Sequence, residues 1–519
     1  MRATALRLAW FGAIGVLATA VHYAAVVALV RGAGWAPIPA NVVAWLLAFV
    51  CSFAGHSRRT FSDSAVPARI AARRFFAISA LGFVANQAGY AMLLQMTAVR
   101  YDVAVPIVAL GVAAMTYVLS RQWAFRPGAA LSAGWLPRSW PVRGVLALHA
   151  IGVLLLAFHA WTHPLGNWDI VPYTALVRAQ PGMTAQQVAD ATFRDVRAYM
   201  GEAHYVDLIE GGPPVRAYRM AIHTDPEALR DTLRFYSIKP LYIGLARWAS
   251  QFTGSGASAG VLVSAAALAL LFSVLPLFFA RPLLAVGAVW LLLLPGGTPL
   301  WLIAACATPD TLGMLLVVLC ALTGLRSAHW AAVGALGVLA VLARPDAAFM
   351  VVPILLGLAW LRRASGQAVL FALSAAACFA LFAFLGTRAL PWSTLFWHTF
   401  METSTYPSRI AQHVGVAEYF AVLRRTAHAL LEPRPLIFLV LGAALSLIPF
   451  VRGRTIAPWQ GLAGIATGGM LLHFLVFPID EFGHERMFLA SYVLLAAAAL
   501  LAWESRDSGK RQAPLEPAP

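Results

Sequence analysis

Charged residues are scarce in this chain of 519 residues: they make up 12% of it, against 60% hydrophobic residues. Soluble proteins carry about 25% charged residues. Apolar runs of roughly twenty residues recur along the whole length, and this is the length at which a helix crosses a bilayer. The composition excludes a soluble enzyme, a disordered chain and a secreted disulfide scaffold. It predicts an all-α polytopic membrane protein.

Cysteine is rare as well, and the usual nucleotide and metal motifs are missing. The four cysteines lie in or beside apolar runs without C-x-x-C spacing, so we expect buried packing residues. We find no glycine-rich phosphate loop and no D-x-D motif, which argues against a soluble-nucleotide donor. Asp169, Asp310 and Asp346 lie far apart along the chain, so no carboxylate cage is predicted. We expect no cofactor and no bound metal; a divalent cation is possible but not indicated.

The apolar runs divide into fourteen predicted transmembrane helices. They lie near residues 8–30, 38–56, 75–97, 104–120, 144–161, 257–280, 282–295, 308–325, 329–343, 346–361, 367–387, 435–451, 457–477 and 487–503.

The net charge of +16 has an explanation in membrane topology. With a cytoplasmic N-terminus, the inner segments hold 20 of the 38 basic residues and four of the 22 acidic ones. This is the positive-inside distribution, so nucleic acid is not an expected partner. Arginine-rich usage and the absence of organelle signals predict a bacterial inner membrane, with both termini cytoplasmic and a disordered tail at 504–519.

The first 127 residues contain a duplicated unit of two predicted helices. Each copy ends in a basic and aromatic segment, HSRRTF at 56–61 and SRQWAF at 120–125. Such side chains can bind cytoplasmic phosphates or act only as interfacial anchors. At an offset of 67, the matching residues are Arg7, Gly15, Ala18 and Tyr23 with Arg74, Gly82, Ala85 and Tyr90.

On these features, residues 5–127 resemble the GtrA-like family of four-span membrane proteins. The resemblance implies the handling of polyprenyl-phosphate-linked sugars and their passage across the membrane. We therefore expect a four-helix membrane domain at 1–127. Residues 128–143, rich in Gly, Pro, Ser and Ala, are expected to form a cytoplasmic linker.

A second module is expected at 144–503. Its first predicted helix leads to a long outer loop, 162–256, with nine acidic residues between Asp169 and Asp231. The loop ends in an amphipathic stretch, 237–252, that suits either a helix on the outer bilayer surface or a docking helix of the loop.

This layout resembles the GT-C class of integral-membrane glycosyltransferases. The resemblance implies inverting transfer of a sugar from a polyprenyl phosphate to an acceptor on the outer face, with an acidic residue of the first outer loop as base. The matching segments are NWDIVPY at 167–173, FYSIKPLY at 235–242, ATPDTLG at 307–313, ARPDAAF at 343–349 and GHERMFLASY at 483–492.

Asp169 is the candidate general base. It follows a predicted span by eight residues, which places it near the outer bilayer surface. A carboxylate there can take the proton of an attacking hydroxyl. The alternative is a loop carboxylate that caps a turn. Tyr173, one helical turn further on, is a candidate substrate contact or an interfacial aromatic.

Cations are expected around the leaving phosphate, because they stabilise its growing charge. Lys239, one of two lysines, lies between Tyr236 and Tyr242 and suits a contact to phosphate, with snorkelling as the alternative. Arg344 lies in a short turn between two apolar runs. With Asp346 or Asp310 it forms either part of the substrate site or a structural ion pair.

Two further segments complete the candidate site. Arg486 opens the last span beside His484; the GT-C resemblance implies a phosphate-facing arginine there, while the sequence alone permits an interfacial anchor. No second histidine follows at helical spacing, so a zinc site is not predicted. The outer loop 388–434 holds His398 and Arg409, which are candidates for the acceptor site, although a lone histidine commonly has a structural role.

Together these patterns predict a glycosyltransferase with a GtrA-like domain that handles or flips its lipid-linked donor. The expected partners are the polyprenyl-phosphate-sugar, a glycan, lipid or protein acceptor, and membrane lipids. The alternative is a flippase or transporter of lipid-linked sugar without transferase chemistry, because buried charges and helix breaks also suit a moving pathway.

Overall fold

The computed structural model describes most of the chain and divides it into two compact units, Met1–Leu136 and Pro137–Pro519. Within the described residues, every regular element is a helix and no strand occurs. The described residues are 2–35, 37–62, 64, 66–72, 74–76, 78–79, 82, 109–113, 116–117, 120, 125, 140–212, 215–294, 298–326, 329–363, 366–411, 413–451, 457–479 and 484–511.

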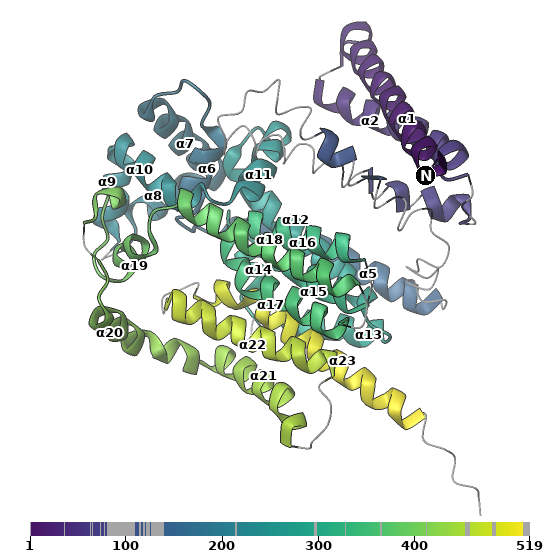
Figure 1. The fold of residues 1–519 in the computed structure, drawn as a ribbon. Helices are drawn as coiled ribbons and strands as arrows, with labels where there is room; N and C mark the ends of the chain where they lie inside the picture. The colour runs from purple at the N-terminus through teal and green to yellow at the C-terminus, as the bar shows by residue number, and fades with distance from the viewer. Residues whose placement is uncertain are drawn as a thin grey trace, which may run out of the picture. The chain divides into compact units, whose positions relative to one another are not determined.

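The first unit is built on two long helices that pack together, α1 (Arg2–Val27) and α2 (Pro37–Gly55) (Figure 1). Each continues into a short π-helix, η1 (Ala28–Gly32) and η2 (His56–Thr60). An aromatic cluster gathers beyond η2, where Phe61 stacks on Phe125 with ring centroids 4.5 Å apart. These two residues end the segments HSRRTF and SRQWAF, so the last residues of the two segments stack on each other.

The second predicted helix pair of this unit, near 75–97 and 104–120, lies largely outside the described residues. The linker predicted at 128–143 does so too, apart from residues 140–143, which begin a helix. The duplication and the domain limits therefore stay predictions.

The second unit contains the remaining apolar helices, long and short, together with the short 3-10 helices between them. They are α5 (Trp140–Thr162), α12 (Gly256–Val274) with η4 (Leu275–Phe278), α13 (Pro282–Leu293), α14 (Leu300–Ala304), α15 (Asp310–Arg326), α16 (Trp330–Ala343), η5 (Pro345–Ala347), α17 (Ala348–Leu361), α18 (Gln367–Arg388), α21 (Pro433–Val451), α22 (Pro458–Val476), η8 (His484–Phe488) and α23 (Leu489–Arg511). Between α18 and α21 lie α19 (Trp392–Phe400), η6 (Pro407–Arg409), α20 (Val416–Thr426) and η7 (Ala427–Leu431).

Several of these helices suit a bilayer, so the chain is a multi-pass membrane protein. In the described part of the chain, six helices are long and apolar enough to span, and a seventh span results if the pair Val416–Leu431 and Pro433–Leu447, bent by 83°, counts as one. The fourteen predicted spans are not confirmed. One reason is length: the apolar helices Pro282–Leu293, Trp330–Ala343 and Pro345–Leu361 are shorter than a span requires.

The predicted outer loop is a layer of six helices, which we call the α6–α11 layer. Its members are α6 (Ile170–Arg178), α7 (Ala185–Met200), α8 (Glu202–Glu210), α9 (Arg216–Thr224), α10 (Pro226–Tyr236) and α11 (Pro240–Thr253). Figure 1 shows α7 to α10 grouped together within the second unit. Their apolar faces share one core that includes Val171, Phe193 and Leu229.

Local sequence explains where these helices begin. Thr184 and Gln187 form a capping box at α7. The Asp225 side chain accepts hydrogen bonds from the backbone N–H groups of Glu227 and Ala228, and Pro226 occupies the first turn of α10. The amphipathic stretch forms α11, which packs against α6, α12 and α16. This packing favours a docking helix over one that lies alone on the bilayer surface.

Asp195 connects the α6–α11 layer to the start of α12. Its buried carboxylate accepts hydrogen bonds from Arg178 Nε at 2.6 Å, Ser255 Oγ at 2.6 Å and the Gly256 N–H at 2.7 Å. Arg178 also donates to the Gly254 carbonyl oxygen at 2.7 Å. One carboxylate thus joins the end of α6, α7 and the start of α12.

The C-terminal end differs from its prediction. A disordered tail is predicted from Glu504, whereas α23 continues to Arg511. Glu504 accepts a hydrogen bond from the Arg281 N–H at 3.1 Å and lies 3.8 Å from the Arg326 guanidinium. These contacts anchor Glu504, the first residue of the additional helical stretch.

Candidate functional site

Ionisable side chains from six segments of the second unit meet at one place, which we call the charged cluster. Three members lie at the ends of apolar helices: Asp310 opens α15, Arg344 follows α16 and His473 is in the last turn of α22. The cluster comprises Asp169, Lys239, Asp310, Arg344, Asp346, His473 and Arg486.

Asp169, just before α6, is one of the two cluster members that the α6–α11 layer contributes; the other is Lys239, just before α11. Asp169 is 9% exposed, and its Oδ2 lies 2.5 Å from Nη1 of Arg486. Tyr236 donates a hydrogen bond to its Oδ1 at 3.2 Å. The side chain makes no capping hydrogen bond at α6; instead, the Asn167 side chain accepts from the Asp169 N–H. The turn-capping alternative therefore describes Asn167 better than Asp169.

Lys239 lies among aromatic rings beside Asp169. Its Nζ is 5.6 Å from the centroid of Tyr173 and 5.2 Å from that of Tyr236, and it donates to the Phe235 carbonyl oxygen at 3.2 Å. Burial lowers the pKa of Lys239 to about 8, and the Arg344 and Arg486 charges act in the same direction. Its positive charge is thus held by ring faces and nearby carboxylates, as in cation–π sites.

Tyr173, Tyr236 and Tyr242 pack together beside the Lys239 ammonium group. Tyr173 meets both Tyr236 and Tyr242 edge to face, with centroids 5.2 Å and 5.0 Å apart. Tyr242 is fully buried and donates to the Gly260 carbonyl oxygen at 3.0 Å. Burial raises the pKa of Tyr173 and of Tyr236 well above the usual value, so both stay neutral. Tyr236 is therefore a permanent hydrogen-bond donor to Asp169.

Arg344 is bound on two sides by carboxylates. It contacts Asp346 through two bonds, Nε to Oδ1 at 3.1 Å and Nη2 to Oδ2 at 2.5 Å, and its Nη1 pairs with Asp310 Oδ1. Both pairings that the sequence left open thus exist at once. Among the described residues, Asp310 Oδ2 is buried without a hydrogen-bond partner. A buried carboxylate oxygen of this kind is an acceptor available to a ligand hydroxyl.

Sequence reasoning missed His473. Its Nδ1 bonds to the Gly469 carbonyl oxygen at 2.7 Å, and its Nε2 lies 3.3 Å from Asp346 Oδ2. Both ring nitrogens of His473 therefore face oxygen atoms, which orients the ring toward Asp346. The signal was available, because an ionisable residue inside an apolar run is costly unless it is paired or functional.

The ion pair between Glu485 and Arg434, which the sequence also did not reveal, supports the segment that carries Arg486. Glu485 accepts from Arg434 at 2.8 Å and from the Tyr492 hydroxyl at 3.3 Å. On the other side, the Met487 sulfur accepts from Arg344 Nη2 at 2.9 Å. The residues on both sides of Arg486 are therefore anchored, which orients its guanidinium.

The remaining predicted site residues lie apart from the cluster. His398 is packed against Phe235 and Tyr218, and its Nδ1 accepts the Ser404 N–H at 3.1 Å. Burial lowers the pKa of His398 to about 4, so it has the structural role of a neutral ring.

Arg409 is exposed, and its guanidinium lies 3.8 Å from the ring centroid of Tyr406. The structure does not bring it to the cluster. The side chain of His484 lies outside the described residues.

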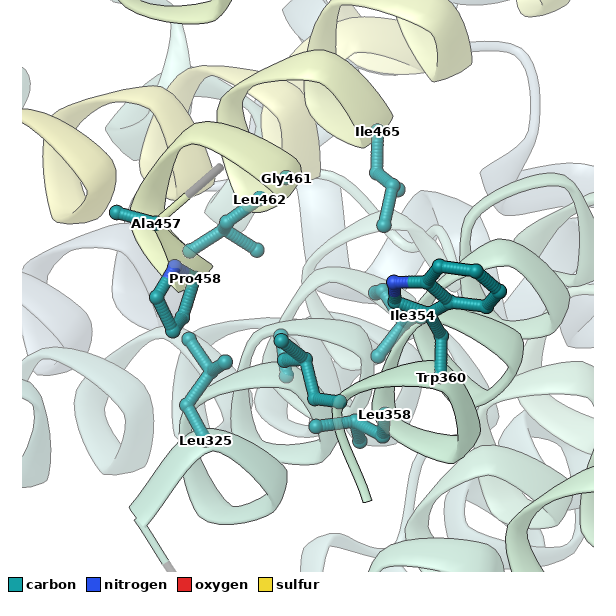
Figure 2. A pocket seen from close by; sticks show the side chains of 12 residues that line it. Leu325, Ile354, Leu358, Trp360, Ala457, Pro458, Gly461, Leu462 and Ile465 are labelled. Atoms are coloured by element: carbon teal, nitrogen blue, oxygen red, sulfur yellow. The ribbon is translucent and has the colours of Figure 1, made fainter. Parts of the chain in front are cut away.

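An apolar cavity lies at the other end of the helices that carry the cluster. It has a volume of about 150 Å³, and Figure 2 shows Leu325, Trp360 and Pro458 among the side chains around it. On α22, twelve residues separate Gly461 in this cavity from His473, which corresponds to about 18 Å along a helix. The cavity accepts only apolar groups and does not include the cluster.

Comparison with known proteins identifies the N-terminal part. Residues 10–125 match the family described as GtrA/DPMS, transmembrane domain. The match confirms the GtrA-like part of the sequence resemblance. No curated protein and no solved structure matches the chain. The resemblance of residues 144–503 to GT-C enzymes stays a prediction.

Proposed function

We propose that the protein is a membrane glycosyltransferase that moves a sugar from a polyprenyl-phosphate-linked donor to a glycan, lipid or protein acceptor. One observation carries the proposal: Asp169 and Arg486 are 317 residues apart in the sequence and form a buried ion pair beside Lys239 and Arg344. A carboxylate and several cations at one place are what displacement of a sugar from a phosphate requires. The GtrA/DPMS match at residues 10–125 supports the handling of such lipid-linked sugars by the N-terminal domain.

In the proposed reaction, an acceptor hydroxyl attacks the anomeric carbon of the donor sugar. The bond between that carbon and the phosphate oxygen breaks with its electron pair leaving on the phosphate, and Asp169 takes the hydroxyl proton. A single displacement of this kind inverts the anomeric centre. General base catalysis contributes about 10²- to 10⁴-fold.

Lys239, Arg344 and Arg486 would stabilise the leaving phosphate. Its charge increases as the bond breaks, so cations placed there stabilise the transition state more than the ground state. Asp346 and Asp310 hold the Arg344 guanidinium in place, and His473 holds Asp346. His484 and Tyr242 remain candidates at the edge of this site.

The Asp169–Arg486 pair suggests how the base becomes available. A phosphate that binds Arg486 competes with Asp169 for the same N–H groups, since arginine prefers bidentate oxygen partners. Donor binding would thus release Asp169 for the acceptor, while Tyr236 keeps it oriented. The unpartnered Asp310 Oδ2 would accept a hydrogen bond from a hydroxyl of the donor sugar.

The finer topology belongs to this proposal. It comprises fourteen spans, a duplicated helix pair at 1–127, a GT-C-like module at 144–503 and cytoplasmic termini in a bacterial inner membrane. The acceptor side is then periplasmic, and the α6–α11 layer faces it. His398 and Arg409 would belong to the periphery of the acceptor side, and no metal or nucleic acid is required.

A flippase is the second candidate, favoured by the GtrA-like match and by the interruption of the apolar helices at Pro309 and Pro345. The experiment that separates the two uses purified protein in detergent with a polyprenyl-phosphate-hexose donor and a cell-envelope acceptor extract. A glycosyltransferase releases polyprenyl phosphate, which mass spectrometry detects. A pure flippase releases none, because detergent offers no second leaflet and no bond is broken.

A further inference from the structure

A cleft in the α6–α11 layer, away from the charged cluster, has a volume of about 480 Å³. One wall is a row of polar side chains along α7: Gln186, Asp190, Arg194 and Arg197. Their spacing of three or four residues places them on one helix face. The Gln186 amide donates to Asp190 Oδ1 at 2.8 Å. The wall therefore presents carboxylate, amide and guanidinium groups side by side, which are both hydrogen-bond acceptors and donors.

The floor of the cleft is aromatic. Phe193 and Tyr205 are buried beneath it, and His223 meets the Phe193 ring edge to face at 4.6 Å. The Tyr205 hydroxyl lies 3.0 Å from His223 Nε2, which fixes the orientation of the imidazole. A rigid apolar floor under a polar wall is the general composition of a small-ligand site, and the volume falls within the usual range of about 300–1,000 Å³.

The charges around the cleft balance. Arg197 is neutralised by Glu202, through contacts at 2.5 Å and 2.7 Å. Arg194 is then offset by Asp190, which lies one turn away on the same face. Burial lowers the pKa of His223, so this ring is neutral at neutral pH. Without excess positive charge, a phosphate or other anion gains little here, and a neutral ligand rich in hydroxyl groups is favoured.

We propose that this cleft is a carbohydrate-binding site. Each hydroxyl of a sugar both donates and accepts, which matches the groups of the α7 wall, while the C–H face of the sugar ring packs on the half-buried His223 ring, which Phe193 and Tyr205 support from below. A peptide is less suited, because the cleft exposes no edge strand and no continuous apolar groove among its described lining residues.

The helix α10 connects the cleft to Asp169, so the position of the cleft indicates which part of a substrate it would bind. Pro226, at the start of α10, lines the cleft, and Tyr236, at the end of α10, donates to Asp169. Ten residues of helix correspond to about 15 Å. The cleft thus binds a distal sugar of an acceptor glycan whose reacting end lies at Asp169. This last step rests on the proposed glycosyltransferase function; the carbohydrate site itself does not.

The test measures binding, not transfer. The full-length protein in detergent, carrying a fluorescent label, is applied to an array of bacterial glycans, and Kd values for the bound glycans are then measured. Asp190→Ala should weaken binding at least tenfold, and Thr224→Trp, at an exposed position that lines the cleft, should abolish it. Asp207→Ala is the matched control, because Asp207 is exposed on α8 and does not line the cleft.

Two results would overturn the assignment. The first is that no glycan binds the wild-type protein, including the case in which a parallel peptide array does bind. The second is that Asp190→Ala and Thr224→Trp bind glycans as the wild type does. Asp169→Asn separates the two proposals, since it should keep glycan binding while donor cleavage is lost. If the wild type binds glycan but never cleaves donor, the glycosyltransferase proposal fails and the carbohydrate site remains.

Discussion

Arg486→Met removes the ion-pair partner of Asp169 and leaves a buried carboxylate unpaired. The Arg486 side chain is 24% exposed and that of Asp169 13%, and Arg486 Nη1 lies 2.5 Å from Asp169 Oδ2. Removing one partner of a buried pair costs about 3–5 kcal/mol, because an uncompensated charge remains. Tyr236 still donates to Asp169, and Lys239 remains within electrostatic range. We therefore expect a loss at the lower end, about 3 kcal/mol.

The measurement is a double-mutant cycle with Arg486→Met, Asp169→Asn and the double variant. Unfolding in mixed SDS micelles, followed by tryptophan fluorescence, gives the free energy of unfolding. The double variant should be more stable than Arg486→Met, because no buried charge is left unpaired. A matched control, Arg216→Met, breaks the exposed pair with Glu210 and should change stability little. If the effects of the two substitutions add within about 0.5 kcal/mol, the pair is not formed and the reasoning is refuted.

Three further predictions concern the cluster and its support. Burial lowers the pKa of Lys239 to about 8, so its ammonium form is lost as the pH rises through 8. The KM for donor should therefore rise above pH 8 in the wild type and stay level in Lys239→Arg. The same rise in both proteins would contradict a contact between Lys239 and the donor phosphate. Asp195→Asn weakens three hydrogen bonds to a buried carboxylate and should lower the free energy of unfolding by about 2–3 kcal/mol; an unchanged value would show that the junction with α12 is not held there. Gly313→Ala would place a Cβ 2.9 Å from Arg344 Cδ, so Arg344 must shift away from its two carboxylate partners; the KM for donor should rise tenfold or more and the free energy of unfolding should fall. Gly287→Ala, with nothing within 4 Å, should match the wild type.

Apolar runs predicted the long helices well, because length and hydropathy alone decide them. The helix predicted at 367–387 is α18, Gln367–Arg388, and that predicted near 257–280 is the candidate span Gly256–Phe278. The end of α23 was not predictable in this way, since its last residues are polar and Glu504 contacts Arg281, 223 residues away in the sequence. Of the six helices of the layer, only α11 was predicted, from the amphipathic stretch 237–252. The other five were expected as a loop, because they are short and gain their stability from the shared core.

The cluster was predictable residue by residue but not as a set of pairs. Asp169, Arg344 and Arg486 stood out because an ionisable side chain near the end of an apolar run requires an explanation, and Lys239 stood out as one of two lysines, placed between two tyrosines. Their partners depend on tertiary packing, so Arg486 with Asp169 and His473 with Asp346 could not be read from spacing. The burial of His398 could not be predicted either, because its packing against Phe235 and Tyr218 joins segments that lie far apart in the sequence.

The central claim is that Asp169 acts on a polyprenyl-phosphate-linked sugar. Its most direct test compares Asp169→Asn with Asp207→Asn, the same chemical change at an exposed position of the α6–α11 layer, in the assay of polyprenyl phosphate release. The account predicts that Asp169→Asn folds, binds donor and releases polyprenyl phosphate about 10²- to 10⁴-fold more slowly, while Asp207→Asn equals the wild type. Release by folded Asp169→Asn at the wild-type rate would contradict the account.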